Sequence, residues 1–434
     1  MSLRIAHFSD LHYADETLVE VDRCFTHAVD HAIAAQVDVA IITGDTTDHA
    51  LSAHSPAVFA LARQIQRLAN HCPVLMLQGT YSHEPPGFLS LFPLIRGKHP
   101  IWVADHIQQV ALTEGGNWIA SASWQFETMP RATRLMCTCI PTQNRAALAT
   151  SVGAPDVAGA MGNQVTQVLA GYAQGHLAAR QAGIPVALLS HGTVHGCVTE
   201  HGVPMAGSDH EFTTGALFDA EATAVMLGHI HRHQSWTQNG RRIAYAGSIG
   251  RLHYGEDGDK GALIWDVDAN TAGTALHPTP ARRTLDISFD GPPDLDKLTQ
   301  FVAAHVIEGA WVRVRWQVLE EERASVDRAR IEGLLAGASG VKLEGRIIPV
   351  VRARAAGIAR ELSLPRQIAH WAEVTGVDGS DLLACFEQLR EENPDMIAQR
   401  ILQQSALPVP ADIAAAPRSQ SVSPGTIEPL PLLL

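Results

Sequence analysis

The chain has 434 residues, of which 46% are hydrophobic and 18% are charged. This balance is typical of a soluble globular protein with a full core, and it excludes disorder across the whole chain. A chain of this length normally folds as more than one domain. The formal net charge of −13 weakens a nucleic-acid-binding function, because phosphate contacts usually come from Lys and Arg. It does not exclude that function, since bound divalent cations would neutralise part of the acid.

The N-terminal residues enter an apolar run directly, without the basic region and cleavage site of an export signal. No stretch approaches the roughly 18 consecutive apolar residues of a membrane span, and six cysteines are too few for a disulfide scaffold. We therefore expect a cytoplasmic protein with no membrane segment. Histidine is unusually abundant, with 22 residues, and a clustered excess of imidazole is what a metal enzyme requires.

Short apolar runs alternate with helical patterns through the first 260 residues, which is typical of an α/β core. A helix is predicted between the second and third runs, because Ser55 can cap it, Pro56 suits its first turn and an apolar stripe follows. The runs predicted to be buried strands are residues 3–8, 37–42, 74–77, 186–189 and 225–227.

Residues 130–180 form an insertion rich in Ala, Gly and Gln, which is predicted to be helical from about Val157. The sequence does not reveal its role. Another apolar strand follows Arg241, and residues 262–267 are expected to close the sheet. These elements complete an expected first domain of residues 1–275.

A second region, residues 281–350, follows a group of prolines. Within it, residues 311–316 alternate as a half-buried strand does and residues 326–335 suggest a helix, so we expect a small α+β domain. Residues 355–405 are predicted to be a mainly helical C-terminal region. The final segment, 406–434, is rich in Pro, Ala and Ser and is expected to be a flexible tail.

Each predicted core strand is followed by residues that can bind a metal, and the carboxyl ends of strands are where α/β sheets place their sites. Taken singly, these signals are weak, because an isolated D-x-H is more often a surface polar pair and GD is often only a turn. Together and in this order they make coincidence implausible. The segments are Asp10-Leu11-His12, Gly44-Asp45 with Asp48, Gly79-Thr80-Tyr81-Ser82-His83-Glu84, Ser190-His191-Gly192 and Gly228-His229-Ile230-His231.

This series resembles the calcineurin-like metallophosphoesterase superfamily, whose pattern is D-x-H, GD, GNH(D/E), H and GH-x-H. Within that superfamily the chain is most similar to SbcD-type DNA repair nucleases. The residues that carry the likeness are 5–12, 44–48, 227–232, 245–248 and Lys260-Gly261. The resemblance covers residues 1–270 well. It implies a four-layer αββα sandwich followed by a small α+β capping domain and C-terminal helices.

The resemblance also implies two divalent metal ions, usually Mn²⁺. Carried over by position, one metal would take Asp10, His12 and His231. The other would take His191 and His229, with Asp45 bridging both. Such paired metals activate a water for attack on phosphorus and stabilise the charge that develops. His83 would act as the catalytic general acid or charge stabiliser near the leaving oxygen.

One motif departs from the family. The family's third motif has an Asn whose amide oxygen is a metal ligand, whereas residues 79–84 contain no Asn. Ser82, directly before His83, is the positional replacement. Because a hydroxyl is a weaker metal ligand, we expect the second metal to bind less tightly or to take an extra water. An inactive site is the alternative.

The SbcD-type resemblance implies a DNA substrate, with exonuclease action at duplex ends and endonuclease action on single strands, in repair or recombination. The arginines of the capping domain would meet phosphates, or they belong to a mixed, solvated surface; they are Arg282, Arg283, Arg313, Arg315 and Arg346. The family pairs its nuclease with an SbcC-type coiled-coil ATPase through C-terminal helices. Residues 365–404 provide that contact or pack on the second domain. A homodimer is also expected.

Two other functions stay open on the sequence. A phosphodiesterase for cyclic nucleotides or another small phosphoester would use the same metal motifs. The acidic charge favours it, and the large extra region disfavours it. A scaffold with a weak site, which binds DNA ends or a partner, is the non-catalytic alternative. A serine hydrolase has little support, because residues 246–250 fail the G-x-S-x-G pattern at its first position.

Overall fold

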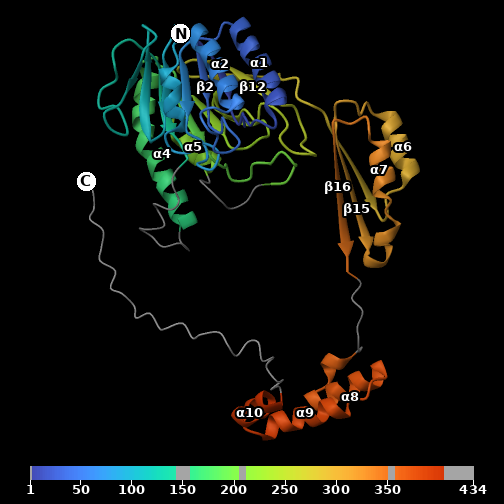
Figure 1. The fold of residues 1–434 in the computed structure, drawn as a ribbon. Coiled ribbons are helices and arrows are strands. Elements are labelled where there is room, and N and C mark those ends of the chain that lie inside the picture. Colours follow the sequence, from blue (N-terminus) through green and yellow to red (C-terminus); the bar gives the residue numbers. More distant parts are fainter. Residues whose placement is uncertain (1, 143–156, 205–211, 350–356, 405–434) are drawn as a thin grey trace, which may run out of the picture. The chain divides into compact units, whose positions relative to one another are not determined.

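The computed structural model describes residues 2–142, 157–204, 212–349 and 357–404. Figure 1 shows its elements along the chain. The chain divides into two compact units at the boundary between Ile348 and Pro349. The tail expected for 406–434 lies outside the described residues, as do residues 143–156 of the expected insertion.

In the described residues, the first sheet has six strands in the order β13-β12-β1-β2-β3-β4. Strands β1 to β4 run parallel to one another, and β12 runs antiparallel to both of its neighbours, β1 and β13. Two helices, α1 (Leu18–Ala34) and α2 (Pro56–His71), pack on one face. The strands are β1 (Leu3–Phe8), β2 (Val39–Ile42), β3 (Val74–Leu77), β4 (Ile101–Ala104), β12 (Gly261–Val267) and β13 (Ala272–Pro278).

The second sheet has seven strands in the described part of the chain, in the order β10-β11-β9-β8-β7-β5-β6. Helices α4 (Val157–Gln181) and α5 (Thr214–Asp219) cover its outer face. Its strands are β5 (Gln108–Thr113), β6 (Trp118–Ala120), β7 (Thr133–Ile140), β8 (Val186–His191), β9 (Ala224–Gly228), β10 (Gln234–Gln238) and β11 (Arg241–Tyr245).

The two sheets pack face to face, which gives the expected four-layer α/β sandwich (Figure 1). Strand β3 shows why its sequence is apolar throughout. Leu75 and Leu77 point between the sheets, whereas Val74 and Met76 point toward α1 and α2. A strand buried on both faces needs apolar residues at every position rather than at alternate positions. The strands predicted at 3–8, 37–42, 74–77, 186–189 and 225–227 are confirmed, with small shifts at their ends.

Two further predictions had mixed outcomes. The helix after β2 is confirmed, with the Ser55 hydroxyl accepting a hydrogen bond from the Ala57 amide at 3.1 Å. The prediction that residues 262–267 close the first sheet is wrong. Strand β12 lies between β1 and β13, so β13 forms the edge. The short strand of residues 272–278 was missed because its residues are mostly half-exposed and lack an apolar run.

The second region mixes helices and strands, as expected. Strands β14 (Thr284–Asp290), β15 (Trp311–Leu319) and β16 (Gly340–Ile348) run parallel in that order. Helices α6 (Leu295–Ala304) and α7 (Arg328–Leu334) cover one face, where alternate residues of β15 are buried. The other face of this sheet is polar, because the intervening residues include Arg313, Arg315 and Gln317.

The C-terminal unit is helical in its described residues. It contains the short 3₁₀ helix η4 (Ile358–Arg360), then α8 (Leu364–Thr375), α9 (Ser380–Glu391) and α10 (Pro394–Gln404). Helices α8 and α9 have no buried residue. None of the helices in the described residues combines the length and the apolar character needed to cross a bilayer.

Candidate metal centre

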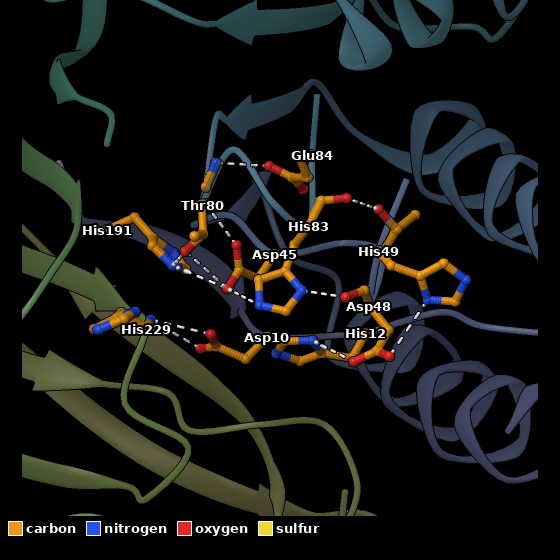
Figure 2. A network of polar contacts seen from close by, with 12 residues as sticks. Asp10, His12, Asp45, Asp48, His49, Thr80, His83, Glu84, His191 and His229 are labelled. Atoms are coloured by element: carbon orange, nitrogen blue, oxygen red, sulfur yellow. Dashed lines mark hydrogen bonds and ion pairs between the residues drawn. The ribbon is translucent and has the colours of Figure 1, made fainter. Parts of the chain in front are cut away.

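The carboxyl ends of strands from both sheets meet at one place, and all the sequence-predicted residues except Ser82 lie there. Figure 2 labels Asp10, His12, Asp45, His83, His191 and His229 among them. His191 is the last residue of β8, and its Nδ1 donates to the Thr43 carbonyl oxygen, 2.7 Å away, just after β2. At Gly228, the last residue of β9, an added Cβ would lie 2.2 Å from the same carbonyl oxygen. Only glycine permits this approach, so it allows the two sheets to meet at the site.

Asp10, His12 and His231 form the first cluster, with one ligand atom of each lying within 4.8 Å of the others. The Nε2 atoms of His12 and His231 are 3.1 Å apart. His231 Nε2 is 3.9 Å from Asp10 Oδ1. Two imidazole nitrogens and a carboxylate oxygen therefore converge on one point. Imidazole and carboxylate are ligands for borderline divalent metals.

Asp45, His191 and His229 form the second cluster, again with one ligand atom of each within 4.8 Å of the others. Asp45 Oδ2 lies 3.2 Å from His191 Nε2. The backbone amide of His229 lies 3.1 Å from each carboxylate oxygen of Asp10, to which it donates, and this joins the two clusters. Figure 2 shows the Asp10 and Asp45 carboxylates pointing into the same space.

His83 lies beside both clusters. Its Nδ1 donates to the carbonyl oxygen of Asp48, and its Nε2 is 4.0 Å from Asp45 Oδ2. Its ring also packs edge-on against His12, with 4.8 Å between centroids. Because Nδ1 is held by the backbone, Nε2 is the nitrogen that faces the site. Asp48 has a second contact here, 3.4 Å from His12 Nδ1.

Thr80 lies where we expected Ser82. Its hydroxyl is 3.3 Å from Asp45 Oδ2 and 3.3 Å from His191 Nε2, and its amide donates to Asp45 Oδ1 at 2.6 Å. Ser82 is exposed. The reason is a turn in which the amides of His83 and Glu84 both donate to the Thr80 carbonyl. This turn carries Ser82 outward, so counting back from His83 selected the wrong hydroxyl.

Glu84 is a buried residue of the candidate site that the sequence reasoning did not single out. Its buried carboxylate accepts hydrogen bonds from the Thr46 amide, the Thr46 hydroxyl and the Gly79 amide, each at 2.6 Å. It thereby ties the loop after β2 to the loop after β3. Burial, reinforced by the nearby Asp45 carboxylate, raises the pKa of Glu84 to about 7. The sequence signal for Glu84 was its place directly after His83, where the third motif of the family has Asp or Glu.

The backbone is strained at four of the candidate ligands. The φ angles of Asp10, His12, Asp45 and His229 are 50°, 49°, 52° and 93°. L-residues rarely adopt positive φ, and such strain of about 1–3 kcal/mol per residue concentrates at functional sites. The fold holds these residues in costly conformations that turn their side chains toward one another.

Burial disfavours the charged forms of the ionisable groups in this site, whereas their neighbours of opposite charge favour them. Burial raises the pKa of Asp10. Burial alone would lower the pKa of His191, but the neighbouring Asp45 carboxylate raises it to about 10. Buried carboxylates packed among imidazoles need positive charge to be stable together. The donor set and the two facing imidazole nitrogens therefore fit two divalent cations.

Comparison with known proteins gives matches to solved structures alone, since no family model and no curated protein matches the chain. The anchor protein of the inner membrane complex of Plasmodium aligns at TM-score 0.40 and 12% identity, over 65% of this chain and 90% of that one. A dimetal phosphatase from Danio rerio aligns at TM-score 0.39 and 11% identity, over 63% and 98%. A protein described as a predicted phosphoesterase from Streptococcus pneumoniae aligns at TM-score 0.22 and 11% identity, over 64% and 99%. Similarity at this level does not assign an activity to the chain.

Proposed function

We propose that this chain is a two-metal phosphodiesterase of the calcineurin-like metallophosphoesterase superfamily, and that it is an SbcD-like DNA nuclease. One observation carries the phosphodiesterase part. Two Asp/His clusters, each drawn from both sheets, share one site, and the Asp10 carboxylate, the His229 amide and the Asp45 carboxylate connect them. Paired carboxylate and imidazole sites of this kind suit in-line displacement at phosphorus.

The residues divide into metal ligands and one residue that transfers a proton. Asp10, His12 and His231 would hold one cation, and His191 and His229 the other, with Asp45 between them. When bound, the cation pair supplies Lewis acidity to the phosphate and to the attacking water; we propose Mn²⁺.

His83 has the proton-handling role. Because the Nδ1–H of His83 donates to the Asp48 carbonyl, a proton given to the leaving oxygen would come from Nε2 of the imidazolium form, which would also stabilise charge there. Glu84 holds the loops that set the distance from His83 to Asp45.

A cleft beside the metal centre supports a substrate larger than a single phosphoester. It has a volume of about 410 Å³, and residues of the core and of the second region line it together. His253 connects the cleft to the site, with its ring centroid 6.4 Å from that of His231. Lys342 contributes a cation and Trp311 an aromatic surface from the second region. Cationic and aromatic groups together suit a nucleic acid strand.

The arginines predicted to contact phosphate differ in how far they are already engaged. Arg313 and Arg315 pair with Asp286 at 2.6 and 2.9 Å, and Arg282 lies over the Trp311 ring at 4.1 Å. Arg283 donates to the Glu308 carbonyl at 3.1 Å, and Arg346 lines a separate cleft of about 790 Å³. Paired cations contribute less to phosphate binding than free ones. We therefore expect moderate DNA affinity with a shallow salt dependence.

The C-terminal helices support the proposed ATPase partner. Val374, Leu382 and Leu389 are 52%, 48% and 63% exposed. Apolar side chains left uncovered on consecutive amphipathic helices are typical of a surface that binds a partner helix. An SbcC-type coiled-coil ATPase is the occupant we propose. The homodimer stays a prediction.

The test is incubation of the purified chain with linear duplex and single-stranded DNA in Mn²⁺. We expect metal-dependent cleavage that falls roughly 100-fold or more in His83→Ala, with Mn²⁺ binding retained. His106→Ala is the matched control, because that imidazole is 71% exposed and lies outside the site. Hydrolysis of bis(4-nitrophenyl) phosphate but not of DNA would indicate a small phosphoester as the substrate. Mn²⁺ binding without hydrolysis of either would indicate a scaffold.

A further inference from the structure

A buried ion pair lies directly behind the first metal cluster. Lys260 and Glu256 are 2% and 3% exposed, and the ammonium nitrogen is 2.5 Å from Glu256 Oε2. Burying two charges costs solvation that their attraction does not fully return, so such a pair contributes little net stability. Its retention in the core is better explained by geometry that the pair imposes on its neighbours.

Lys260 holds the backbone of a candidate ligand. Its Nζ donates to the His231 carbonyl oxygen at 2.8 Å and to the Ser248 hydroxyl at 3.0 Å. The Ser248 amide donates to the same His231 carbonyl at 3.2 Å. A Cβ added to Gly247 would lie 3.1 Å from that oxygen, so this loop packs tightly against the turn that carries His231. The Ser248 hydroxyl lies 3.4 Å from the same oxygen, so three donors from one loop fix a single carbonyl, and Lys260 makes the shortest of these bonds.

This backbone contact matters because no acceptor among the described residues holds the second ring nitrogen of His231. A metal-ligating histidine normally donates its second ring N–H to an acceptor that fixes the ring. His191 follows this rule, with Nδ1 donating to the Thr43 carbonyl. His231 Nδ1 is buried and has no hydrogen-bond partner within the described ranges. The position of the His231 imidazole thus depends on its backbone.

Glu256 extends the same arrangement toward the substrate cleft. Its Oε1 accepts hydrogen bonds from the amides of Leu252 and His253 at 2.8 and 2.5 Å. Its carbonyl accepts from the hydroxyl of Thr284, the first residue of β14, at 2.8 Å. One buried pair therefore contacts the His231 turn, the loop with His253 and the start of the second region.

We propose that Lys260 is a positioning residue for the Asp10–His12–His231 half of the metal centre and sets the metal affinity of that half selectively. The inference rests on the proposed function, because it requires His231 to be a ligand. The Asp45–His191–His229 half has its own supports, the Thr43 carbonyl and Thr80. Loss of Lys260 should consequently weaken one cation and spare the other.

Three variants separate positioning from stability. Lys260→Met removes the bond to His231 and leaves a buried carboxylate unpaired. Glu256→Gln keeps an acceptor for the Leu252 and His253 amides and leaves Lys260 in place. The double variant Lys260→Met/Glu256→Gln removes the unpaired charge without restoring the bond to His231. Arg180→Met is the matched control. Arg180, on α4, forms a half-buried ion pair with Glu221 at 2.7 Å.

Two measurements are made on the full chain. The first is a Mn²⁺ titration, in which electron paramagnetic resonance measures the free ion. The second is thermal unfolding, with EDTA and with Mn²⁺. In Lys260→Met we expect one of two Mn²⁺ ions to bind about 10–100-fold more weakly, the usual effect of losing a support behind a ligand. The other ion should keep its affinity. The double variant should regain melting temperature in EDTA without regaining the weakened ion, and Glu256→Gln and Arg180→Met should bind both ions nearly as wild type does.

The outcomes distinguish this inference from the function on which it rests. A wild-type chain that binds fewer than two Mn²⁺ ions contradicts the two-metal centre itself, and Lys260 then has no ligand to position. A wild-type chain that binds two ions, with Lys260→Met binding both equally well, overturns the positioning role alone. In that second case the melting temperature would fall by the same amount with EDTA and with Mn²⁺, as for a purely structural pair.

Discussion

The two sheets of the core contribute unlike halves of the metal centre. The six-stranded sheet supplies both carboxylates of the metal clusters, Asp10 and Asp45, together with His12 and His83. The seven-stranded sheet supplies imidazoles, from His191, His229 and His231 in the described residues. The negative charge that would offset two cations therefore comes from one sheet, whereas the other would complete the coordination with neutral imidazoles.

This difference predicts unequal effects of substitution. Removing a carboxylate changes the net charge of the site and the number of ligands, whereas removing an imidazole changes the number of ligands alone. The halves are still coupled, since the His229 amide donates to Asp10 and the His191 ring donates to the Thr43 carbonyl. Both sheets must therefore be in register for the site to form.

The largest expected effect comes from Asp45→Asn. Asp45 is buried, lies 3.2 Å from His191 Nε2 and faces His83, so its loss should disturb both cations. We expect Mn²⁺-dependent hydrolysis to fall roughly 10⁴-fold, or about 5.5 kcal/mol. Steady-state rates measure this, with Asp105→Asn, on a half-exposed loop residue, as the control. A loss of under about tenfold would contradict a bridging role.

The next largest effect is a loss of stability in acid. It comes from His176, a histidine of α4, on the outer face of the seven-stranded sheet and outside the candidate metal centre. Burial lowers the pKa of His176 to about 4, and its ring is held by the Ala220 carbonyl at 2.6 Å and the Thr138 hydroxyl at 2.7 Å. Between pH 4 and the unfolded value near 6.5, the unfolded state binds one more proton, so stability falls as the pH falls.

The loss amounts to about 1.4 kcal/mol per pH unit and about 3 kcal/mol over the whole window. Urea unfolding in EDTA from pH 6.5 to 4 measures it. His176→Gln, which preserves a donor and an acceptor, should reduce the slope by that amount. An unchanged slope in the variant would mean that His176 does not contribute to the proton uptake.

A smaller effect is expected at Thr80, where a hydroxyl lies beside Asp45 and His191. Thr80→Asn introduces an amide oxygen, a better ligand, and should tighten the weaker Mn²⁺ ion about tenfold, or about 1.4 kcal/mol. Thr80→Val is the matched control and should not tighten it. Mn²⁺ titration distinguishes the two variants. Equal affinities would show that this position does not contact the second cation.

The smallest effect tests the cleft outside both halves. Lys342 lines it but pairs with Glu344 at 2.7 Å, so Lys342→Ala should weaken DNA binding about two- to threefold and reduce the salt slope by about one. Lys297→Ala, on α6, is the control because Lys297 also pairs with an acid, Asp294 at 3.8 Å. Fluorescence anisotropy with labelled DNA at several salt concentrations measures both. Equal DNA affinities and salt slopes for Lys342→Ala and Lys297→Ala would show that DNA does not bind in the cleft.

The sequence predicted the parts of the fold that depend on local pattern. The run 74–77 is apolar throughout because both of its faces are buried, the run 3–8 is apolar apart from Arg4 and His7, and the structure has strands with both sets of bounds. Strand β7 was missed because it lies within a segment whose Ala- and Gly-rich composition drew attention to the helix beyond it.

The candidate site was predictable where ligands follow strands directly. Asp10, Asp45, His191 and His229 were found in this way, and the structure brings them together. Thr80 was not found, because the turn after it decides which hydroxyl faces inward. The Lys260–Glu256 pair was not found either, because its role depends on contact with His231 across the loop between β11 and β12.

The most direct test of the two-metal centre is the number and coupling of Mn²⁺ ions bound to the wild-type chain. Titration by electron paramagnetic resonance should give two ions per chain, with a spin-coupled spectrum that Asp45→Asn abolishes, since the two clusters share Asp10 and Asp45 contacts. One uncoupled ion per chain, or two ions whose spectrum is unchanged by Asp45→Asn, would contradict the account.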